Sequence, residues 1–238
     1  MDKKRFNELY NRAFEKNYKV FTDFLNLDEQ SILEGEYLPC IKFGGYKNAE
    51  RIVAGFGDEI DYSDFPIRII CISPSAPKFA DKLSHRDFLG ALMNLGIKRE
   101  LLGDIVISEN KAYLFCLESI AKYICESLSR VRHTTVKCSL IDCLPDTAVN
   151  EPEEIEINVS SLRADNLIAG VFHLSRKSCS ELFSSDRVFV NSRLCQNPSQ
   201  KTQDGDIISV RGFGRFHVCS PLRKTKKQRT IVAVKIYK

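Results

Sequence analysis

The spacing of apolar residues along the chain predicts alternating helical and extended segments. A stripe at helical spacing predicts an N-terminal helix and contains Phe6, Leu9, Tyr10, Ala13 and Phe14. A second helix is expected around Val20, Phe21, Phe24 and Leu25, and a third from Asp28, a candidate N-cap. Two extended runs follow, at 38–43 and 51–56. Residues 1–64 therefore read as a small N-terminal α/β unit.

Residues 65–150 predict the order β-α-β-β-α-β. The expected strands lie at 67–72, 104–107, 112–116 and 135–141. One helix begins at a capping box of Ser84 and Asp87, and the other has an apolar stripe from Leu117 to Leu128. This order indicates a ferredoxin-like fold, which RNA-recognition motifs share. Tyr113 and Phe115 share a strand face, as core residues or as a platform for stacked bases.

Residues 151–238 predict a third domain that begins with an acidic, proline-containing linker. An edge strand is expected at 155–159, a short helix after Ser161 and another after Ser175. Short strands follow at 188–190 and 207–210. The chain is therefore expected to be an α+β protein with domains at 1–64, 65–150 and 151–238.

Three short strings allow either a structural or a functional interpretation. Gly44-Gly45 suits a turn with positive φ or a close approach of the backbone to a ligand. His85-Arg86-Asp87 looks like a catalytic triplet on paper, but nothing places a nucleophile beside it, and helix capping explains it. The basic run 223–229 is a solvated loop or a flexible phosphate clamp.

The nine cysteines and four histidines are scattered, with no C-x-x-C pair. Zinc sites need four clustered ligands at short spacing, so we expect no metal and no cofactor. Reduced cysteines that pack as small apolar residues fit a reducing compartment. No apolar run approaches the ~20 residues that span a bilayer, and the N-terminus leads into no signal-like apolar stretch. The expectation is a cytoplasmic monomer that does not associate with membranes.

The charge is distributed unevenly along the chain. Residues 160–238 hold 15 Lys and Arg against 5 Asp and Glu, a net charge of +10, whereas residues 1–159 carry a net charge of −6. Such asymmetry is typical of a polyanion-binding module on a body that does not bind anions everywhere.

Basic and polar residues of this segment form the predicted RNA-binding surface. Ser175, Arg176 and Lys177 lie at a helix start, where free N–H groups and the positive dipole end favour phosphate. Arginine suits phosphate because its planar fork binds two oxygens. The predicted RNA-binding residues are Arg163, Asn166, Ser175, Arg176, Lys177, Arg187, Asn191, Arg193, Lys201, Arg211 and Arg215.

Residues 160–212 resemble the S-four domain, an RNA-binding module named after a small-subunit ribosomal protein. The matching elements are Arg163 with Asp165, Leu174-Ser175-Arg176, Val188-Phe189-Val190-Asn191 and Gly205-Asp206-Ile207. Ala164 and Ser192 depart from the usual leucine and glycine, and Asp186 adds a negative charge to the anion-binding surface.

Longer strings resemble the YlmH family. They run from Gly44 to Arg51, from His85 to Arg99 with Gly103-Asp104-Ile105 after it, and from Ser209 to Phe216. The resemblance implies a bacterial, cytoplasmic protein that binds ribosomal RNA and tRNA on the large ribosomal subunit, in rescue of stalled nascent chains. It also implies a link to a cell-division protein.

Two other functions remain open at this stage. S-four domains also anchor RNA-modifying enzymes, but the chain has no nucleotide-binding glycine loop and no synthetase or synthase signature, so we expect no catalysis. The acidic first two segments are the alternative binding surface for a division protein.

Overall fold

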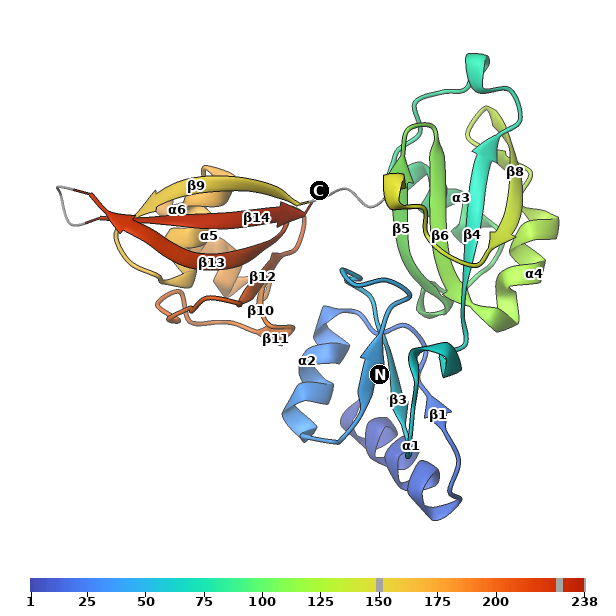
Figure 1. Cartoon of the computed structure of the whole chain (residues 1–238), viewed down its shortest axis with the longest axis horizontal. Helices are drawn as coiled ribbons and strands as arrows, with labels where there is room; N and C mark the ends of the chain where they lie inside the picture. Colours follow the sequence, from blue (N-terminus) through green and yellow to red (C-terminus); the bar gives the residue numbers. More distant parts are fainter. Residues whose placement is uncertain (149–151, 226–228, 238) are drawn as a thin grey trace. The chain divides into compact units, whose positions relative to one another are not determined.

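The structure is a computed structural model that describes residues 1–148, 152–225 and 229–237. Its contacts group the chain into two compact units. The first holds Met1–Glu29 and Glu36–Val149, and the second holds Gln30–Gly35 and Asn150–Lys238. The class is mixed α and β with antiparallel sheets (Figure 1). The finer division into domains 1–64, 65–150 and 151–238 stays a prediction.

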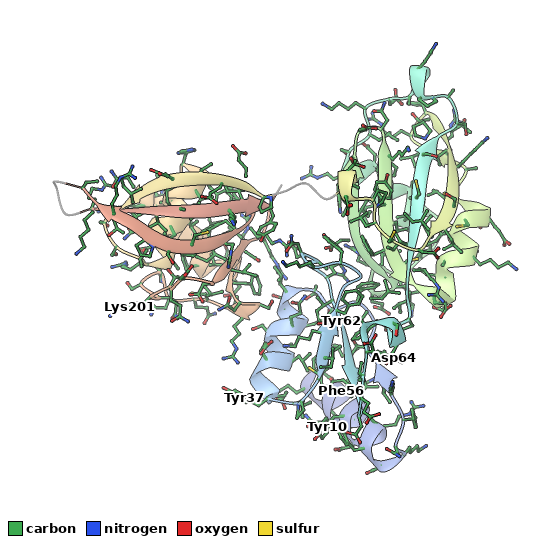
Figure 2. All side chains as sticks on the ribbon, viewed as in Figure 1. Tyr10, Tyr37, Phe56, Tyr62, Asp64 and Lys201 are labelled. Carbon is green, nitrogen blue, oxygen red and sulfur yellow. The ribbon has the colours of Figure 1, made fainter. Side chains whose placement is uncertain are left out.

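The N-terminal segment packs helix α1 against a small sheet. Its elements are α1 (Lys3–Glu15), β1 (Val20–Phe21), α2 (Leu27–Glu36), β2 (Ile41–Phe43) and β3 (Val53–Phe56), with strand order β1-β3-β2. Residues 30–35 of α2 group with the second unit. The predicted helical stripe is confirmed, because Phe6, Leu9 and Ala13 are buried. The Tyr10 ring lies edge-on to the ring of Phe56 in β3, and the two centroids are 6.2 Å apart. Figure 2 labels both residues.

The helix expected around residues 20–25 was wrong. Val20 and Phe21 pair with Phe56 and Gly55 as strand β1. The Thr22 hydroxyl accepts the Ala54 N–H, which extends this contact with β3. β-branched and aromatic residues suit a pleated strand, so tertiary pairing decided against the helical spacing. The third helix is confirmed, but its N-cap is Asn26, which forms a capping box with Glu29.

The remainder of the first unit has the predicted order β-α-β-β-α-β, with short 3-10 turns between elements and one added strand, β7, between α4 and β8. The elements are β4 (Ile67–Pro74), α3 (His85–Asn94), β5 (Leu102–Ser108), β6 (Lys111–Leu117), α4 (Glu118–Ser127), β7 (Arg130–Val131) and β8 (Thr134–Ile141). The sheet order is β5-β6-β4-β8-β7, with all described pairs antiparallel. The capping box of Ser84 and Asp87 is confirmed, and Gly96 follows α3 with φ +77°.

Both faces of this sheet are covered. Helices α3 and α4 pack on one face through Phe88, Leu92, Ala121 and Ile124. Residues of the N-terminal segment pack on the other face, around the buried ring of Phe115. This second cluster includes Phe24, Val53, Phe65, Ile69, Tyr113 and Leu117, with Phe43 and Tyr46 partly buried against it. The sheet is therefore the middle layer of the unit.

The Asp104 carboxylate fastens the segment after β2 to strand β5. It accepts hydrogen bonds from the Tyr46 hydroxyl at 2.9 Å, the Glu50 N–H at 2.6 Å and the Arg51 N–H at 3.1 Å. The Tyr46 ring stacks on Phe115 with centroids 4.9 Å apart. Gly45 has φ +96°, and a Cβ there would collide with the Phe115 ring. The glycine pair thus serves a turn and close packing against an aromatic ring.

Two partly buried arginines complete this junction. Arg51 donates to the carbonyl oxygens of Leu102 and Phe24 at 2.9 and 2.8 Å. Arg99 donates to the carbonyl oxygen of Leu102 at 2.7 Å. Burial and the neighbouring Arg51 lower the pKa of Arg99 to about 10, so it stays protonated near neutral pH. Carbonyl oxygens therefore solvate both cations in place of water.

The second unit packs two helices on one six-stranded antiparallel sheet. Its elements are β9 (Glu153–Val159), α5 (Ala164–Phe172), α6 (Arg176–Ser184), β10 (Val188–Val190), β11 (Arg193–Leu194), β12 (Ile207–Val210), β13 (Gly214–Lys224) and β14 (Thr230–Tyr237). The order is β11-β10-β12-β13-β14-β9, so β9 is the predicted edge strand. The helices pack on the sheet through buried apolar side chains, which include Leu167, Ile168, Leu182 and Phe183.

Two features of this unit differ from the prediction. Arg163, not Ser161, is the N-cap of α5, and the Ser161 hydroxyl instead accepts a hydrogen bond from the Asn166 side chain at 2.9 Å. The sequence did not predict the long β13–β14 hairpin. The basic run 223–229 interrupts the apolar pattern from which the two flanking strands would be predicted. The described part of the basic run shows Lys224 paired with Thr230, and residues 226–228 lie outside the described residues.

The cysteines are free thiols with differing burial. Cys116, Cys179 and Cys195 are buried, Cys143 is exposed and the others are partly buried. In the part of the chain that the structure describes, no cluster of three or more His, Cys, Asp or Glu could hold a metal ion. No helix among the described residues is long and apolar enough to cross a membrane.

We expect Asp104→Ala to lower the free energy of unfolding by about 2–4 kcal/mol, because three donors lose one charged acceptor. Asp104→Asn keeps one acceptor oxygen and should cost less. Urea unfolding followed by circular dichroism measures both, with the exposed Asp58→Ala as control. An Asp104→Ala protein as stable as the control would contradict this role for the carboxylate.

Cysteine alkylation should follow burial. Burial raises the pKa of the Cys116 thiol to about 12, so at pH 8 very little reactive thiolate is present, and its side chain is 0% exposed. Iodoacetamide should modify Cys143 first and spare Cys116 in the native protein, while denaturant makes all nine thiols react. Peptide mass spectrometry reads the order, and equal native rates at both positions would refute it.

Candidate nucleic-acid interface

The start of α6 presents two cations beside free helix N–H groups. The Ser175 hydroxyl caps the helix by accepting the Ser178 N–H at 3.1 Å. Arg176 and Lys177 follow in the first turn, and both are exposed. Because the positive end of the helix dipole lies at the same place, this turn can bind an anion such as a phosphate.

The start of α5 holds a second group of predicted residues. Arg163 pairs with Lys201 through an isolated β-bridge, so the two residues are neighbours. Figure 2 labels Lys201, which is exposed. The Arg163 guanidinium binds the Asp165 carboxylate at 2.6 Å, and this hydrogen bond raises the pKa of Arg163. Asn166 donates to the Ser160 hydroxyl at 3.0 Å. The side chains of Arg163 and Asn166 thus already hold the helix start together.

Asn191 has a structural role that its sequence pattern did not reveal. Its side-chain amide donates to Asp206 Oδ1 at 2.9 Å, and its side-chain oxygen accepts the Ile207 N–H at 2.9 Å. Asn191 and Ser192 have φ of 51° and 63° and form the turn between β10 and β11. The residue therefore links that turn to the start of β12.

Three arginines on the sheet and its turns lie over aromatic rings. The guanidinium carbon is 5.6 Å from the ring centroid for Arg187 over Phe213, 5.1 Å for Arg211 over Phe189 and 4.8 Å for Arg215 over Tyr237. Such cation–π contacts hold a guanidinium in a fixed orientation while it stays charged. The aromatic partners were missed by the sequence analysis, although the string from Ser209 to Phe216 alternates arginine with phenylalanine.

Arg187 and Arg211 meet at the β12–β13 turn. Arg187 Nε donates to the Arg211 carbonyl oxygen at 3.1 Å. Gly212 has φ +82°, and a Cβ on it would lie 2.5 Å from the Arg187 guanidinium. Glycine at this position therefore leaves the space in which Arg187 crosses the turn.

The predicted residues fall into three groups on different elements. Arg163, Asn166 and Lys201 surround the start of α5, and Ser175, Arg176 and Lys177 form the start of α6. The third group lies on the sheet and its turns and contains Arg187, Asn191, Arg193, Arg211 and Arg215. Arg193 is exposed in β11. The structure joins Arg163 to Lys201 and Arg187 to Arg211, while the assignment of all eleven to RNA binding stays a prediction.

The described ends of the run 223–229 pack along the edge strand. Arg223 forms an ion pair with Glu156 at 3.1 Å, and Arg229 donates to the Asn158 carbonyl oxygen at 2.8 Å. These two residues are thus held to β9, and the choice between a solvated loop and a phosphate clamp stays open for the residues between them.

In the first unit, burial decides the role of Tyr113 and Phe115, and hydrogen bonding decides the role of the string His85-Arg86-Asp87. Tyr113 and Phe115 are 6% and 0% exposed, so they are core residues and offer no platform to RNA bases. Asp87 accepts hydrogen bonds from the Ser84 hydroxyl and N–H, and these lower the pKa of its carboxyl. The string His85-Arg86-Asp87 is therefore a helix start, as capping predicts.

Comparison with known proteins agrees with the strings noted in the sequence. A curated relative from Bacillus subtilis (strain 168) is 34% identical over 235 residues, which cover 92% of this chain and 88% of that protein. The chain belongs to the YlmH family. The Bacillus protein is named ribosome-associated protein quality control protein P2.

Two further matches concern parts of this YlmH-family chain. Residues 61–144 match the family model described as the putative RNA-binding domain in YlmH. A solved structure named cell division protein ylmH, from Streptococcus pneumoniae, is 25% identical, with a TM-score of 0.47 over 58% of this chain and 88% of that one. The family model thus covers the sheet with buried aromatic residues rather than the basic second unit.

Asn191→Ala should destabilise the second unit by about 1–3 kcal/mol, because Asp206 and the Ile207 N–H both lose a hydrogen-bond partner. Arg176→Ala changes an exposed side chain and should stay within about 0.5 kcal/mol of the parent protein. Urea unfolding of the two variants side by side tests whether this separation holds, and equal stabilities would show that Asn191 has no such structural role.

Proposed function

We propose that this protein is a non-catalytic RNA-binding factor of the ribosome. It would bind ribosomal RNA and tRNA on the large subunit during rescue of stalled nascent chains. The observation that supports this most directly is the second unit, where a net charge of +10 over residues 160–238 includes three arginines held over aromatic rings. Membership of the YlmH family and the printed name of the Bacillus relative support the ribosome as the partner.

The chemistry of this surface suits folded RNA. Guanidinium groups bind phosphate oxygens in pairs, and an arginine fixed on a ring pays less conformational entropy on binding. Most such contacts go to the backbone, so the surface would read RNA shape more than sequence. If ~4–6 phosphates are neutralised, affinity should fall with salt at a log–log slope of roughly −3 to −5.

The finer organisation belongs to the same proposal. The second unit would be an S-four-type domain, and the β-α-β-β-α-β sheet of the first unit a ferredoxin-like domain that packs on the N-terminal segment. The protein would act as a monomer in the cytoplasm without a cofactor.

Two other functions would require different observations. An RNA-modifying enzyme would yield a modified base in total RNA that disappears in a mutant. A division-protein partner would remain bound in a pull-down after nuclease treatment. We rank both functions below RNA binding. The arginine–aromatic pairs are a candidate site for RNA, and the described residues provide no comparable site for either alternative.

Arg176→Glu combined with Lys177→Glu should weaken binding to purified large ribosomal subunits at least tenfold, and lower the magnitude of the salt slope by about 1–2. Sedimentation with subunits at several salt concentrations measures both. Lys4→Glu combined with Lys16→Glu makes the same charge change at exposed positions of the N-terminal segment and should bind like the parent protein. Unchanged binding of the Arg176–Lys177 variant would count against the proposal, and a parent protein that ignores subunits at low salt would end it.

A further inference from the structure

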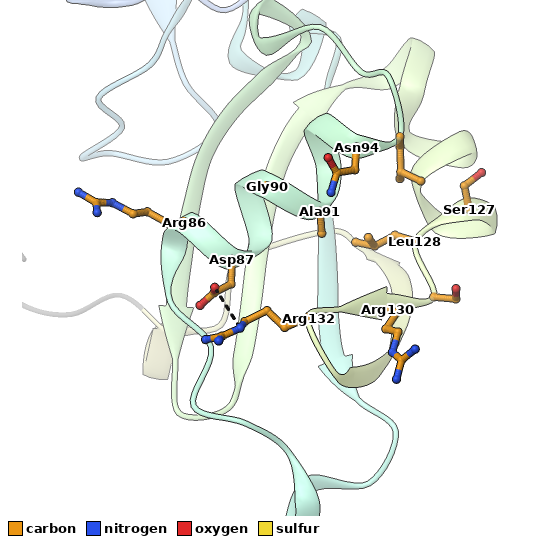
Figure 3. Close-up of a pocket in the computed structure, with 11 residues that line it drawn as sticks. Arg86, Asp87, Gly90, Ala91, Asn94, Ser127, Leu128, Arg130 and Arg132 are labelled. Carbon is orange, nitrogen blue, oxygen red and sulfur yellow. Dashed lines mark ion pairs between the residues drawn. The ribbon is translucent and has the colours of Figure 1, made fainter.

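An open cleft lies on the helix-covered side of the first unit's sheet. It has a volume of about 520 Å³ and lies between α3 and the turn that leads from α4 into β7 (Figure 3). Helix α3 contributes Arg86, Asp87, Gly90, Ala91 and Asn94 to its wall, and the opposite wall is Ser127, Leu128, Ser129, Arg130 and Arg132. This volume is in the range of sites that hold small organic groups.

Three arginines line the cleft against a single carboxylate. Arg132 Nε lies 3.7 Å from Asp87, whose oxygens also cap α3. Within the described ranges, the guanidinium groups of Arg86 and Arg130 have no hydrogen-bond or ion-pair partner, and both residues are exposed. The cleft therefore has an uncompensated positive charge at two positions, although residues 1–159 are acidic overall.

The wall that α3 contributes to the cleft contains a glycine that packing does not explain. Gly90 lies inside α3, where glycine is less favourable than alanine by about 1 kcal/mol. A Cβ built on Gly90 meets no atom within 4 Å, so no neighbour in the described structure excludes a side chain. With Ala91 beside it, the missing side chain leaves helix backbone open to a flat group in the cleft.

The other face of the sheet is unavailable for RNA. Tyr113 and Phe115, which would stack bases in an RNA-recognition motif, are buried beneath Tyr46 and other residues of the N-terminal segment. The family model of a putative RNA-binding domain nevertheless spans 61–144, which includes every residue of the cleft. An RNA contact of this region must then use a surface other than the aromatic face.

We infer that the cleft is a second RNA-binding site. The phosphodiester backbone crosses it on Arg86, Arg130 and Arg132, and one nucleotide rests over Gly90 and Ala91. The inference rests on the proposed RNA-binding function and adds a site on the first unit to it.

The arrangement of the arginines favours a chain of phosphates over a free phosphate ion. Arg86 extends from α3, while Arg130 and Arg132 come from the opposite wall, and Figure 3 shows Arg86 and Arg130 pointing in different directions. A single ion needs donors that converge on one point, whereas a polynucleotide offers a row of charges. Asn94 adds an amide that can donate to and accept from a base edge.

The test compares two cleft variants with matched controls in binding to purified large ribosomal subunits. Arg86→Glu combined with Arg130→Glu should weaken binding about tenfold and lower the magnitude of the salt slope by about 1–2. Gly90→Leu should fill the cleft and weaken binding while α3 stays folded, since leucine favours helices more than glycine does. The controls are Lys122→Glu combined with Lys98→Glu, at exposed lysines outside the cleft, and Gly35→Leu, at a helix glycine whose Cβ also meets no atom.

A photoreactive benzophenone side chain at position 94 should crosslink to RNA, and one at the neighbouring exposed position 93 should not. Melting temperatures confirm that each variant is folded. Cleft variants that bind like their controls would overturn the inference, as would crosslinking at position 94 to ribosomal protein alone. Competition by millimolar inorganic phosphate against a short RNA oligonucleotide would assign the cleft to free anions and overturn it too. Loss of binding only with Arg176→Glu and Lys177→Glu would leave the proposed function standing without this site.

Discussion

The Asp104 carboxylate determines which surfaces of the first unit are exposed. Its hydrogen bonds to Tyr46, Glu50 and Arg51 hold the segment after β2 against β5. That segment carries the Tyr46 ring onto Phe115 and closes the aromatic face of the sheet. A charged acceptor with three donors is worth more than a neutral one, so a local contact fixes the packing of two segments far apart in sequence. A sheet with the element order of an RNA-recognition motif thereby loses the face that such motifs use.

The partly buried arginines of the first unit and the arginine–aromatic pairs of the second have different partners. In the first unit the guanidinium groups of Arg51 and Arg99 donate to main-chain carbonyl oxygens, so these hydrogen bonds are made inside the fold. In the second unit Arg211 and Arg215 lie over rings, which keeps a guanidinium charged and oriented, and Arg187 combines a ring contact with donation to the Arg211 carbonyl oxygen. A count of arginines cannot separate these two uses, because the distinction depends on whether carbonyl oxygens or aromatic faces lie within reach. The net charge of a segment is less affected by this distinction, since the partly buried Arg51 and Arg99 lie near the carboxylates of Asp104 and Glu50.

The parts of the fold that were predictable are those specified by residues close in sequence. The stripe of α1, the capping box at Ser84 and the cap at Ser175 all involve partners within about one helical turn. Strand β1 was missed because it exists only through pairing with β3, more than thirty residues away. Within the candidate interface, the eleven predicted positions were chosen from local charge and motif patterns. The hydrogen bonds of Asn191 to Asp206 and Ile207 did not follow from such patterns, because they join a turn to a distant strand.

Because the aromatic face of the sheet is closed, the string His85-Arg86-Asp87 can have a role in addition to helix capping. As a capping sequence it needs only Ser84 and Asp87, and neither Arg86 nor Gly90 contributes to the cap. Glycine inside a helix is unfavourable, and no packing neighbour in the described structure requires Gly90 on the wall of this cleft. The cost of Gly90 is understandable if the inferred RNA contact is made by the helix layer, because the aromatic face of the sheet is buried. The same constraint that buries Phe115 would then be the reason why the outer surface of α3 is shaped for a ligand.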